Sequence, residues 1–346
     1  MKLIKMLLVA SALLMAGTSM ADDRAKRLTY NNPILPVDNA DPTVMKADDG
    51  YFYFYSSGSD RNVRIYRSRN LVDWIFVGTA FTDATRPRTV SPYVSYKNDD
   101  GTISSPGIWA PDIQYVNGQY VLYYVIGMVD NLPKSGVGVA TSERPEGPFV
   151  DRGCMFLSED VGVANAIDPF FIREDGKNYI VWGSFTGIYI VQLTDDGLRM
   201  MSGATKQRIA GDHIEASYIY KKDGYYYLFG SAGTCCDEAN STYHVVYGRS
   251  QGLFGPYTTK NGDPLLDGKY DTLLQGNDFV AGPGHNAEFM EDDKGQTWII
   301  YHGYLRNDPG RGRVAFLDQV KWRNGWPYMD NNGGPTQTSP APYFNE

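Results

Sequence analysis

The sequence predicts an all-β fold, a five-bladed β-propeller, from two repeated observations. The first is a hairpin unit, in which a run of strand-forming residues, a tight turn and an aromatic run follow one another. The turn glycines of its five copies are Gly50, Gly118, Gly176, Gly224 and Gly295. The second is a further apolar strand after each hairpin, beginning at Val63, Val137, Ile188, Val245 and Val314. Units of about four strands each, repeated in one internal order, are typical of a propeller, whereas a β-sandwich would need these hairpins to coincide by chance.

Residues 1–21 precede the predicted fold and have the features of a secretory signal peptide. Lys2 and Lys5 form a basic start, residues 7–16 form a short apolar run, and Ser19-Met20-Ala21 is a small-x-small cleavage site. The apolar run is too short to cross a membrane. We therefore expect a secreted or periplasmic protein, in which residues 22–346 form a single propeller domain with no membrane anchor.

The charge and composition of the chain limit its partners. The formal net charge is −8, and it becomes −10 when the leader with its two lysines is removed. This acidity argues against nucleic acids and other polyanions, and leaves neutral polymers as candidates. Aromatic residues make up 14% of the chain, and although most must pack between strands, sugar rings also stack on such side chains. We expect a monomer that binds a neutral polysaccharide.

The three cysteines, Cys154, Cys235 and Cys236, do not form a disulfide framework. An odd number leaves at least one thiol unpaired within the chain. A bridge between the adjacent Cys235 and Cys236 would strain the peptide that joins them. Stability must therefore come from the burial of side chains.

Each predicted blade opens near a polar residue. Asp41, Asp168 and Glu215 open the first, third and fourth blades, and Asp112 and His285 open the second and fifth. The proline after Asp41 is expected to keep that aspartate extended. In the second blade, Trp109 precedes the strand near the expected mouth of the propeller, where it would either stack on a sugar or pack in the core.

The first strand of each blade lines the central axis of a propeller, so the five strand starts meet there. Glycoside hydrolysis needs two carboxyl groups, one to protonate the leaving oxygen and one to activate water. A third carboxyl group can raise the pKa of the acid by like-charge repulsion. For a single Asp-Pro pair the simpler interpretation is a strand cap, but several at matched positions favour one asymmetric site. A lectin would repeat one site per blade.

Six stretches carry a resemblance to a known family. They are A-D-P-T-V at 40–44, I-W-A-P-D at 108–112, N-A-I-D-P-F at 165–170, I-E-A-S-Y-I-Y at 214–220, C-C and N-S-T-Y within 235–243, and G-P-G-H-N at 282–286. With these the chain resembles glycoside hydrolase family 43, and most of all its endo-arabinanases, over essentially the whole predicted mature chain. Thr186 and Ser217 depart from the family, which often has tryptophan and proline at these positions.

The resemblance implies an inverting mechanism with Asp41 as the general base, Glu215 as the general acid and Asp168 as the residue that orients the acid and raises its pKa. It leaves Asp112 a structural residue. Inversion requires roughly 6.5–9.5 Å between the two catalytic carboxyl groups. The residues expected to contact the substrate are Asp41, Trp109, Asn165, Ala166, Ile167, Asp168, Ser184 and Phe185.

The resemblance also implies that His285 is associated with a calcium ion held mainly through waters. The alternative is that no metal is present and that His285 is hydrogen-bonded to the catalytic carboxylates. Calcium prefers oxygen ligands, so one nitrogen contact would make a weak, hydrated site.

The implied function is a secreted endo-acting hydrolase of α-1,5-linked arabinan. One alternative is an exo-acting α-L-arabinofuranosidase or β-xylosidase with the same chemistry, because the loops around the mouth decide between the two modes. The other is a propeller that binds glycans without cleaving them.

Overall fold

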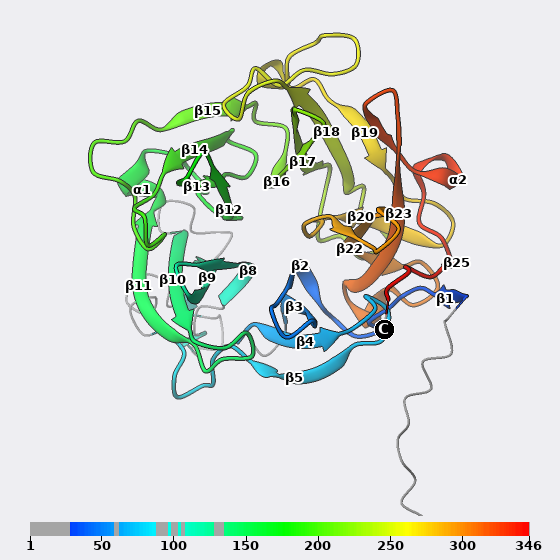
Figure 1. Cartoon of the computed structure of the whole chain (residues 1–346), viewed down its shortest axis with the longest axis horizontal. Helices are drawn as coiled ribbons and strands as arrows, with labels where there is room; N and C mark the ends of the chain where they lie inside the picture. The colour runs from blue at the N-terminus through cyan, green and yellow to red at the C-terminus, as the bar shows by residue number, and fades with distance from the viewer. Residues whose placement is uncertain are drawn as a thin grey trace, which may run out of the picture.

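The computed structural model describes residues 28–58, 62–87, 96–97, 103–104, 108–127 and 135–345. Within them, five antiparallel sheets surround a central axis, which confirms the predicted five-bladed propeller (Figure 1). The predicted leader, residues 1–21, lies outside the described residues. No helix of the described part is long and apolar enough to cross a membrane.

Each blade has its innermost strand first in the chain and its outermost strand last. Blade one consists of β2 (Ala40–Lys46), β3 (Phe52–Ser57), β4 (Arg64–Ser68) and β5 (Ile75–Thr79). Blade two consists of β8 (Ile108–Val116), β9 (Gln119–Ile126), β10 (Gly136–Ser142) and β11 (Val150–Leu157). Blade three consists of β12 (Phe170–Glu174), β13 (Lys177–Trp182), β14 (Ile188–Gln192) and β15 (Gln207–Ala210). Blade four consists of β16 (Glu215–Lys222), β17 (Tyr225–Ala232), β18 (His244–Ser250) and β19 (Asp271–Leu274). Blade five consists of β20 (Val280–Gly284), β21 (Met290–Glu291), β22 (Thr297–Leu305), β23 (Val314–Arg323) and β24 (Trp326–Tyr328).

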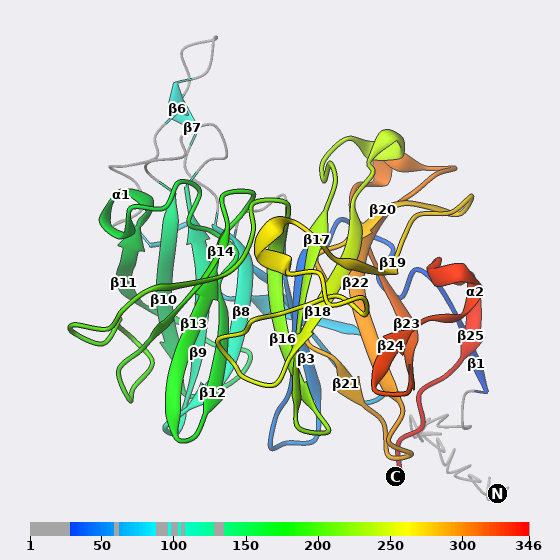
Figure 2. The ribbon, with the colours of Figure 1, turned by 90° about the horizontal axis from the view of Figure 1, so that it is seen from above.

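The remaining elements are short and lie outside the blades. They are the paired strands β1 (Thr29–Asn31) and β25 (Thr338–Pro340), the hairpin β6 (Tyr96–Lys97) and β7 (Ile103–Ser104), the helices α1 (Ser158–Val161) and α2 (Asp330–Gly333), and the 3₁₀ turns η3 (Glu238–Asn240), η4 (Leu265–Asp267) and η5 (Pro309–Arg311). The β6–β7 hairpin and α1 lie at one face of the disc, and the β12–β13 turn lies at the other (Figure 2).

The predicted turns form the first hairpins of the blades. In blades two, three and four, two residues join the first strand to the second, and both have positive φ, as a type I′ turn requires. These pairs are Asn117-Gly118, Asp175-Gly176 and Asp223-Gly224. Blades one and five have longer connections, in which Gly50 and Gly295 also have positive φ.

Aromatic side chains fill the space between neighbouring sheets. Between blades four and five, Phe229 lies 6.0 Å from Tyr218 and 4.7 Å from Phe289, measured between ring centroids. Trp182 of blade three is fully buried against Phe156 of blade two. Such pairs stabilise the packing beyond the burial of their area, so much of the aromatic content serves the core.

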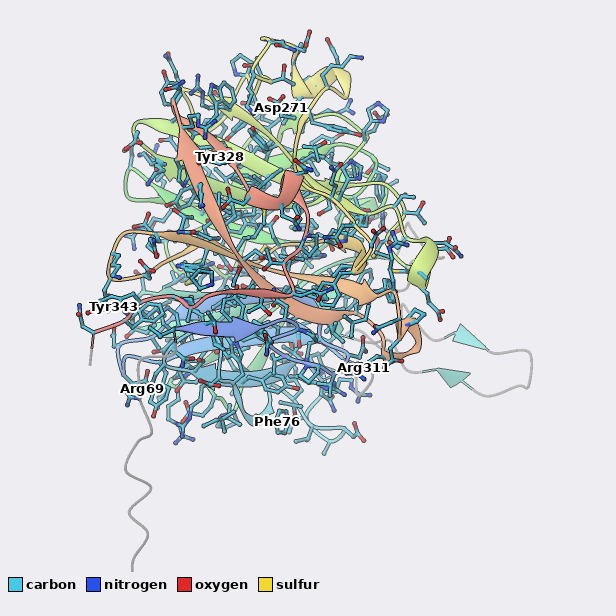
Figure 3. All side chains as sticks on the ribbon, turned by 90° about the vertical axis from the view of Figure 1, so that its right-hand side faces the viewer. Arg69, Phe76, Asp271, Arg311, Tyr328 and Tyr343 are labelled. Carbon is cyan, nitrogen blue, oxygen red and sulfur yellow. The ribbon has the colours of Figure 1, made fainter. Side chains whose placement is uncertain are left out.

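The N-terminal segment closes the ring by completing blade five. The backbone of Ile34 donates to Ala315 (2.9 Å), and Ala315 donates to Leu35 (3.2 Å). Two residues beyond Ala315 on β23, the Leu317 N–H donates to the Asn32 side chain (3.0 Å), and the Asn32 side chain donates to the Leu317 carbonyl (2.9 Å). Figure 3 shows this closing side, with β1 and β25 lying beside blade five and with Arg311 and Tyr343 near opposite faces of the disc.

Candidate active site

Each inner strand approaches the axis through one residue in the left-handed region. These residues are Asp41 (φ 52°), Ala110 (φ 41°), Asp168 (φ 56°), Ala216 (φ 52°) and His285 (φ 46°). The expectation that the following proline keeps Asp41 extended is therefore wrong. Left-handed φ is costly for residues other than glycine, so the surrounding contacts must hold these five in place.

A ring of hydrogen bonds between blades supplies those contacts. The N–H of Ala110 donates to Ser57 Oγ (2.8 Å), and that of Ala216 donates to Asp168 Oδ2 (3.0 Å). The N–H of His285 donates to Ser231 Oγ (2.8 Å). The Asp41 N–H donates to Nδ1 of His302 on β22, at 3.0 Å. In blades one, two, four and five, the left-handed residue thus directs its N–H to the preceding blade and holds the strand starts together.

The polar residues that open the blades do not occupy equivalent positions, contrary to the sequence-based expectation. Asp41, Asp168 and His285 are the left-handed residues of their blades, whereas Glu215 precedes the left-handed Ala216. Asp112 follows Ala110 by two positions, so its side chain lies further along the axis. This shift separates Asp112 from the carboxyl groups at the strand starts.

The Asp41 carboxylate is buried among hydrogen-bond donors and positive charge. Ser57 Oγ donates to Oδ2 (2.7 Å), and Arg313 Nη1 donates to Oδ1 (3.0 Å). His285 Nδ1 lies 3.3 Å from Oδ1. Burial alone would raise the pKa of Asp41, but the charges of Arg313 and His285 outweigh it and hold the pKa well below its ordinary value. Asp41 is therefore ionised across the neutral range.

Glu215 has a different environment, with neutral hydroxyl partners. Ser184 Oγ donates to Oε2 (2.6 Å), and the Tyr243 hydroxyl donates to Oε1 (2.8 Å). Desolvation raises the pKa of Glu215, while these two hydrogen bonds oppose the rise only in part. Glu215 thus keeps its proton to higher pH than an ordinary glutamate.

Asp168 lies beside Glu215, with its Oδ2 bound to the Ala216 N–H. Burial is the largest cause that raises the pKa of Asp168 to about 7. The charge of His285 opposes the rise, and the carboxylates of Glu215 and Asp41 add to it. These three acids therefore share one electrostatic site.

Two histidines face Asp41 in opposite charge states. Burial lowers the pKa of His285, but Asp41 and the other two acids outweigh this and raise it to about 9. The pKa of His302 is well below its ordinary value because of burial and the charge of Arg313. Since Nδ1 of His302 accepts the Asp41 N–H, the proton of its neutral ring lies on Nε2.

The residues expected to contact substrate lie next to Glu215. Asn165 Nδ2 donates to Ser184 Oγ (2.8 Å), while the Asn165 Oδ1 atom is buried with no hydrogen-bond partner. Phe185 is 40% exposed, so its ring is available to a ligand. Ala166 and Ile167 are buried.

Trp109 is half-buried and serves at least in packing. It lies against a small cluster of Ala110, Val125 and Ile167. Its Nε1 donates to the Gly127 carbonyl (2.9 Å), which fixes the orientation of the ring. A role in sugar stacking stays a prediction.

Asp112 belongs to a second acidic group, deeper along the axis. The Thr43 hydroxyl and the Gln114 amide each donate to both Asp112 and Glu288. The Phe171 N–H donates to Asp112 Oδ2 (2.7 Å). Burial and then the neighbouring Glu288 raise the pKa of Asp112 well above its ordinary value. These contacts tie blades one, two, three and five together.

A small cavity of about 30 Å³ separates the two acidic groups. Its lining includes Asp168, His285 and Glu288, and two buried side-chain oxygens without a hydrogen-bond partner, Ser217 Oγ and Asn286 Oδ1. Such oxygens suit water or a hard cation. Among the described residues, no three His, Cys, Asp or Glu side chains are placed to hold a metal directly. A calcium ion would therefore fit here only if waters supplied most of its ligands.

Four residues of the site were not predicted: Ser57, Tyr243, His302 and Arg313. Ser57 is the last residue of β3, Ser231 is the next to last of β17, and His302 lies three residues before the end of β22, so a polar residue near the end of an aromatic strand was an available signal. Tyr243 lies in a stretch that carried the family resemblance. No local pattern marks Arg313, which precedes β23 and reaches Asp41 only in the folded ring.

A propeller whose axial pocket joins an ionised carboxylate to a carboxyl group with a raised pKa has the features of a glycoside hydrolase. Residues 30–327 match the model of glycosyl hydrolases family 43, and the chain belongs to this family. It is a glycoside hydrolase similar to arabinanases, which makes a non-catalytic propeller untenable.

Two relatives and one solved structure show the similarity. The extracellular endo-alpha-(1->5)-L-arabinanase 1 of Bacillus subtilis is 33% identical over 330 residues, covering 92% of this chain and 95% of that protein. The extracellular exo-alpha-(1->5)-L-arabinofuranosidase ArbA of Cellvibrio japonicus is 33% identical over 316 residues, covering 85% and 87%. The structure of Cellvibrio cellulosa alpha-L-arabinanase complexed with arabinohexaose has a TM-score of 0.73 and 31% identity, covering 85% of this chain and 96% of that one.

Proposed function

We propose that the protein is an inverting hydrolase that cleaves α-1,5-linked L-arabinan internally, with Asp41 as general base and Glu215 as general acid. The observation that carries this proposal is the opposite shift of two pKa values in one pocket, lowered for Asp41 and raised for Glu215. When the environment lowers the pKa of one carboxyl group and raises that of the other, the first can act as the base and the second as the acid.

In the proposed reaction, water attacks the anomeric carbon while Asp41 takes a proton from that water. Arg313 and Ser57 hold the Asp41 carboxylate in place. Glu215 gives its proton to the glycosidic oxygen as the carbon–oxygen bond breaks, which leaves a neutral sugar hydroxyl. The hydroxyl groups of Ser184 and Tyr243 can donate or accept, so Glu215 keeps partners in both charge states.

The substrate would lie over the residues beside Glu215. The unpartnered Asn165 Oδ1 can accept a hydrogen bond from a sugar hydroxyl, and the exposed Phe185 ring can stack on a sugar face. The charge of Glu215 is one of the causes that raise the pKa of Asp168, and by the same repulsion an ionised Asp168 would keep Glu215 protonated to higher pH.

Inversion is tested by following the anomeric configuration of the first product with NMR during arabinan hydrolysis. The first product should have the configuration opposite to that of the substrate. A retained configuration would exclude Asp41 as a base acting on water.

The endo mode is supported by the similarity to the endo-arabinanase of Bacillus subtilis, and the exo-acting alternative by the similarity to ArbA of Cellvibrio japonicus. Linear α-1,5-arabinan distinguishes the two modes. Early release of mixed oligomers is expected. Release of a single small product from the chain end would instead support the exo-acting alternative as an α-L-arabinofuranosidase, and activity on a β-xyloside without activity on arabinan would support a β-xylosidase.

We also propose that a calcium ion lies near His285 and is held largely by waters. His285 would have to be neutral, with its Nδ1 proton donated to Asp41 and only Nε2 left for the cation. When bound, calcium would favour ionised carboxylates nearby. Elemental analysis should find calcium that a chelator removes, and its removal should lower the melting temperature. No bound metal and an unchanged melting temperature would make His285 a hydrogen-bonding residue alone.

Residues 1–21 are proposed to direct secretion, and the matched relatives from Bacillus and Cellvibrio are named as extracellular. Mass spectrometry of the exported protein should find a chain that begins at Asp22. Size-exclusion chromatography with light scattering should give the mass of a monomer.

A further inference from the structure

The loop between β17 and β18 places two adjacent cysteines beside the pocket. It spans residues 233–243 and ends at Tyr243, whose hydroxyl donates to Glu215. Cys235 and Cys236 lie near its start, and their Sγ atoms are 2.9 Å apart. The loop thus connects a pair of thiols to the residue proposed as the acid.

The same pair contacts the residue that holds the proposed base. Arg313 Nη1 lies 3.7 Å from Cys235 Sγ and 3.0 Å from Asp41 Oδ1. Cys236 is exposed, while Cys235 is partly buried. A small reagent can therefore reach Cys236 first.

The two thiols differ in reactivity. The hydrogen bond between the two thiols lowers the pKa of Cys236 to about 7, with burial opposing and Arg313 assisting, whereas the pKa of Cys235 is raised. Burial raises the pKa of the remaining cysteine, Cys154 on β11, to about 11. Since the thiolate is the nucleophile, Cys236 is the cysteine that attacks.

We propose that Cys235 and Cys236 form a redox-active dithiol site on the wall of the catalytic pocket, which small organic disulfides close to a vicinal disulfide. The Cys236 thiolate attacks the reagent disulfide, forms a mixed disulfide and releases one reagent thiolate. Cys235 then loses its proton to solvent and its sulfur attacks Cys236 Sγ, releasing the second thiolate. The protein pair loses two electrons, and the reagent gains them.

The closed form is expected to open readily. Neighbouring Cα atoms are about 3.8 Å apart across a trans peptide, below the roughly 4.4–6.8 Å of ordinary disulfides. Strained disulfides are more easily reduced and serve as labile rather than structural bonds. The pair is therefore a site that changes state.

Closure changes the charge near Glu215. The charged or titratable groups that act on Cys236 or respond to it are Arg313, Asp41, Glu215, Cys235 and Tyr304. In the dithiol form, a thiolate on Cys236 repels the Glu215 carboxylate, which keeps Glu215 protonated to higher pH. The disulfide has no such charge, so Glu215 should lose its proton at lower pH.

The chemical test uses the full chain with the Cys154→Ser substitution, so that only the pair can react. Incubation with oxidised glutathione should end in a protein lighter by two hydrogen atoms, with the change located in the peptide that contains both cysteines. Cys235→Ser in the same background should stop at the mixed disulfide. A stable glutathione adduct on the intact pair, or no reaction, would overturn the proposal.

The second test compares the pH profile of kcat/KM for the reduced and oxidised forms. Oxidation should move the alkaline limb to lower pH, with about a twofold loss of kcat/KM on that limb. Cys236→Ser should resemble the oxidised form and should not respond to oxidant. Identical profiles of the two wild-type forms would refute the coupling to the pocket. This arm rests on the proposed role of Glu215, whereas the chemical test does not, so either can fail alone.

Discussion

Asp41 and Glu215 occupy one pocket, yet their nearest partners give them opposite properties. Asp41 contacts a guanidinium group and a histidine, whereas Glu215 contacts two hydroxyl groups. Burial raises the pKa of both carboxyl groups, but the positive charges in contact with Asp41 outweigh this effect for Asp41 alone. The assignment of base and acid therefore depends on single contacts.

Substitution of each acid should give a different dependence on the leaving group. Glu215→Gln should lower kcat on arabinan by about 10²–10⁴-fold. It should retain much more activity on a nitrophenyl arabinofuranoside, whose leaving group needs no proton. Asp41→Asn should be impaired on both substrates. If Glu215→Gln lost both activities equally, Glu215 would not be the acid.

The pH profile of kcat/KM should fall on both sides. On the acidic side, activity is lost as Asp41 becomes protonated, and its lowered pKa places that limb at low pH. On the alkaline side, activity is lost as Glu215 ionises, and its raised pKa extends that limb upward.

Removal of the charge on Arg313 should move only the acidic limb. In Arg313→Gln, burial of Asp41 is opposed by less positive charge, so the limb should move to higher pH. Arg311→Gln is the matched control, because Arg311 pairs with Asp308 at the surface, outside this pocket. An unmoved acidic limb in Arg313→Gln would contradict the role of Arg313.

At the scale of the elements, the left-handed residue beside each inner strand decides what reaches the axis. The positive φ turns an N–H toward the neighbouring blade, where a side chain such as Ser57 or Ser231 accepts it. In blades one, two, four and five, such a residue ties its sheet to the preceding one. The same arrangement that closes the ring therefore also places the carboxyl groups.

The segment that completes blade five should carry much of the stability of the ring. Asn32 is buried and makes three hydrogen bonds, to Leu317 N–H and to the carbonyls of Leu317 and Thr336. Asn32→Ala should lower the free energy of unfolding by about 2–4 kcal/mol, since buried backbone groups would lose their partners. Chemical denaturation measures this change.

The neighbouring Asn31 offers the control, because its exposed side chain makes one exposed hydrogen bond with Thr338. Asn31→Ala should cost no more than about 0.5 kcal/mol. Equal effects of the two substitutions would show that Asn32 does not hold the ring closed.

At the scale of the whole molecule, both ends of the described chain meet at blade five. Strands β1 and β25 pair with each other, and residues 34–35 pair with β23. An open ring would expose the edge of β23 and let blades one and five separate.

A chain that begins at Asp22 should therefore be stable, whereas one that begins at Pro36 should melt at least about 10 °C lower or aggregate. Calorimetry and light scattering compare the two. If the shorter chain melted at the same temperature, the N-terminal segment would not close the propeller.

The sequence by itself determined the number of blades, the first turns and the acids at the strand starts. These features follow from local chemistry, because a turn of two residues with positive φ and a strand of alternating residues need no distant partner. Asp41, Asp168, Glu215 and His285 could be found for the same reason, since each lies in or near a recognisable strand, although the structure places His285 after β20 rather than at the start of a strand.

Only the tertiary structure decided the electrostatics of the site. Asp41 and Arg313 are far apart in sequence, as are Glu215 and Ser184, and they meet because the ring closes. The left-handed conformation of Asp41 is likewise held by His302 of the last blade, so its local Asp-Pro sequence gave the wrong expectation. A pKa depends on which charges surround a group, and that is set by the packing of blades rather than by any stretch of chain.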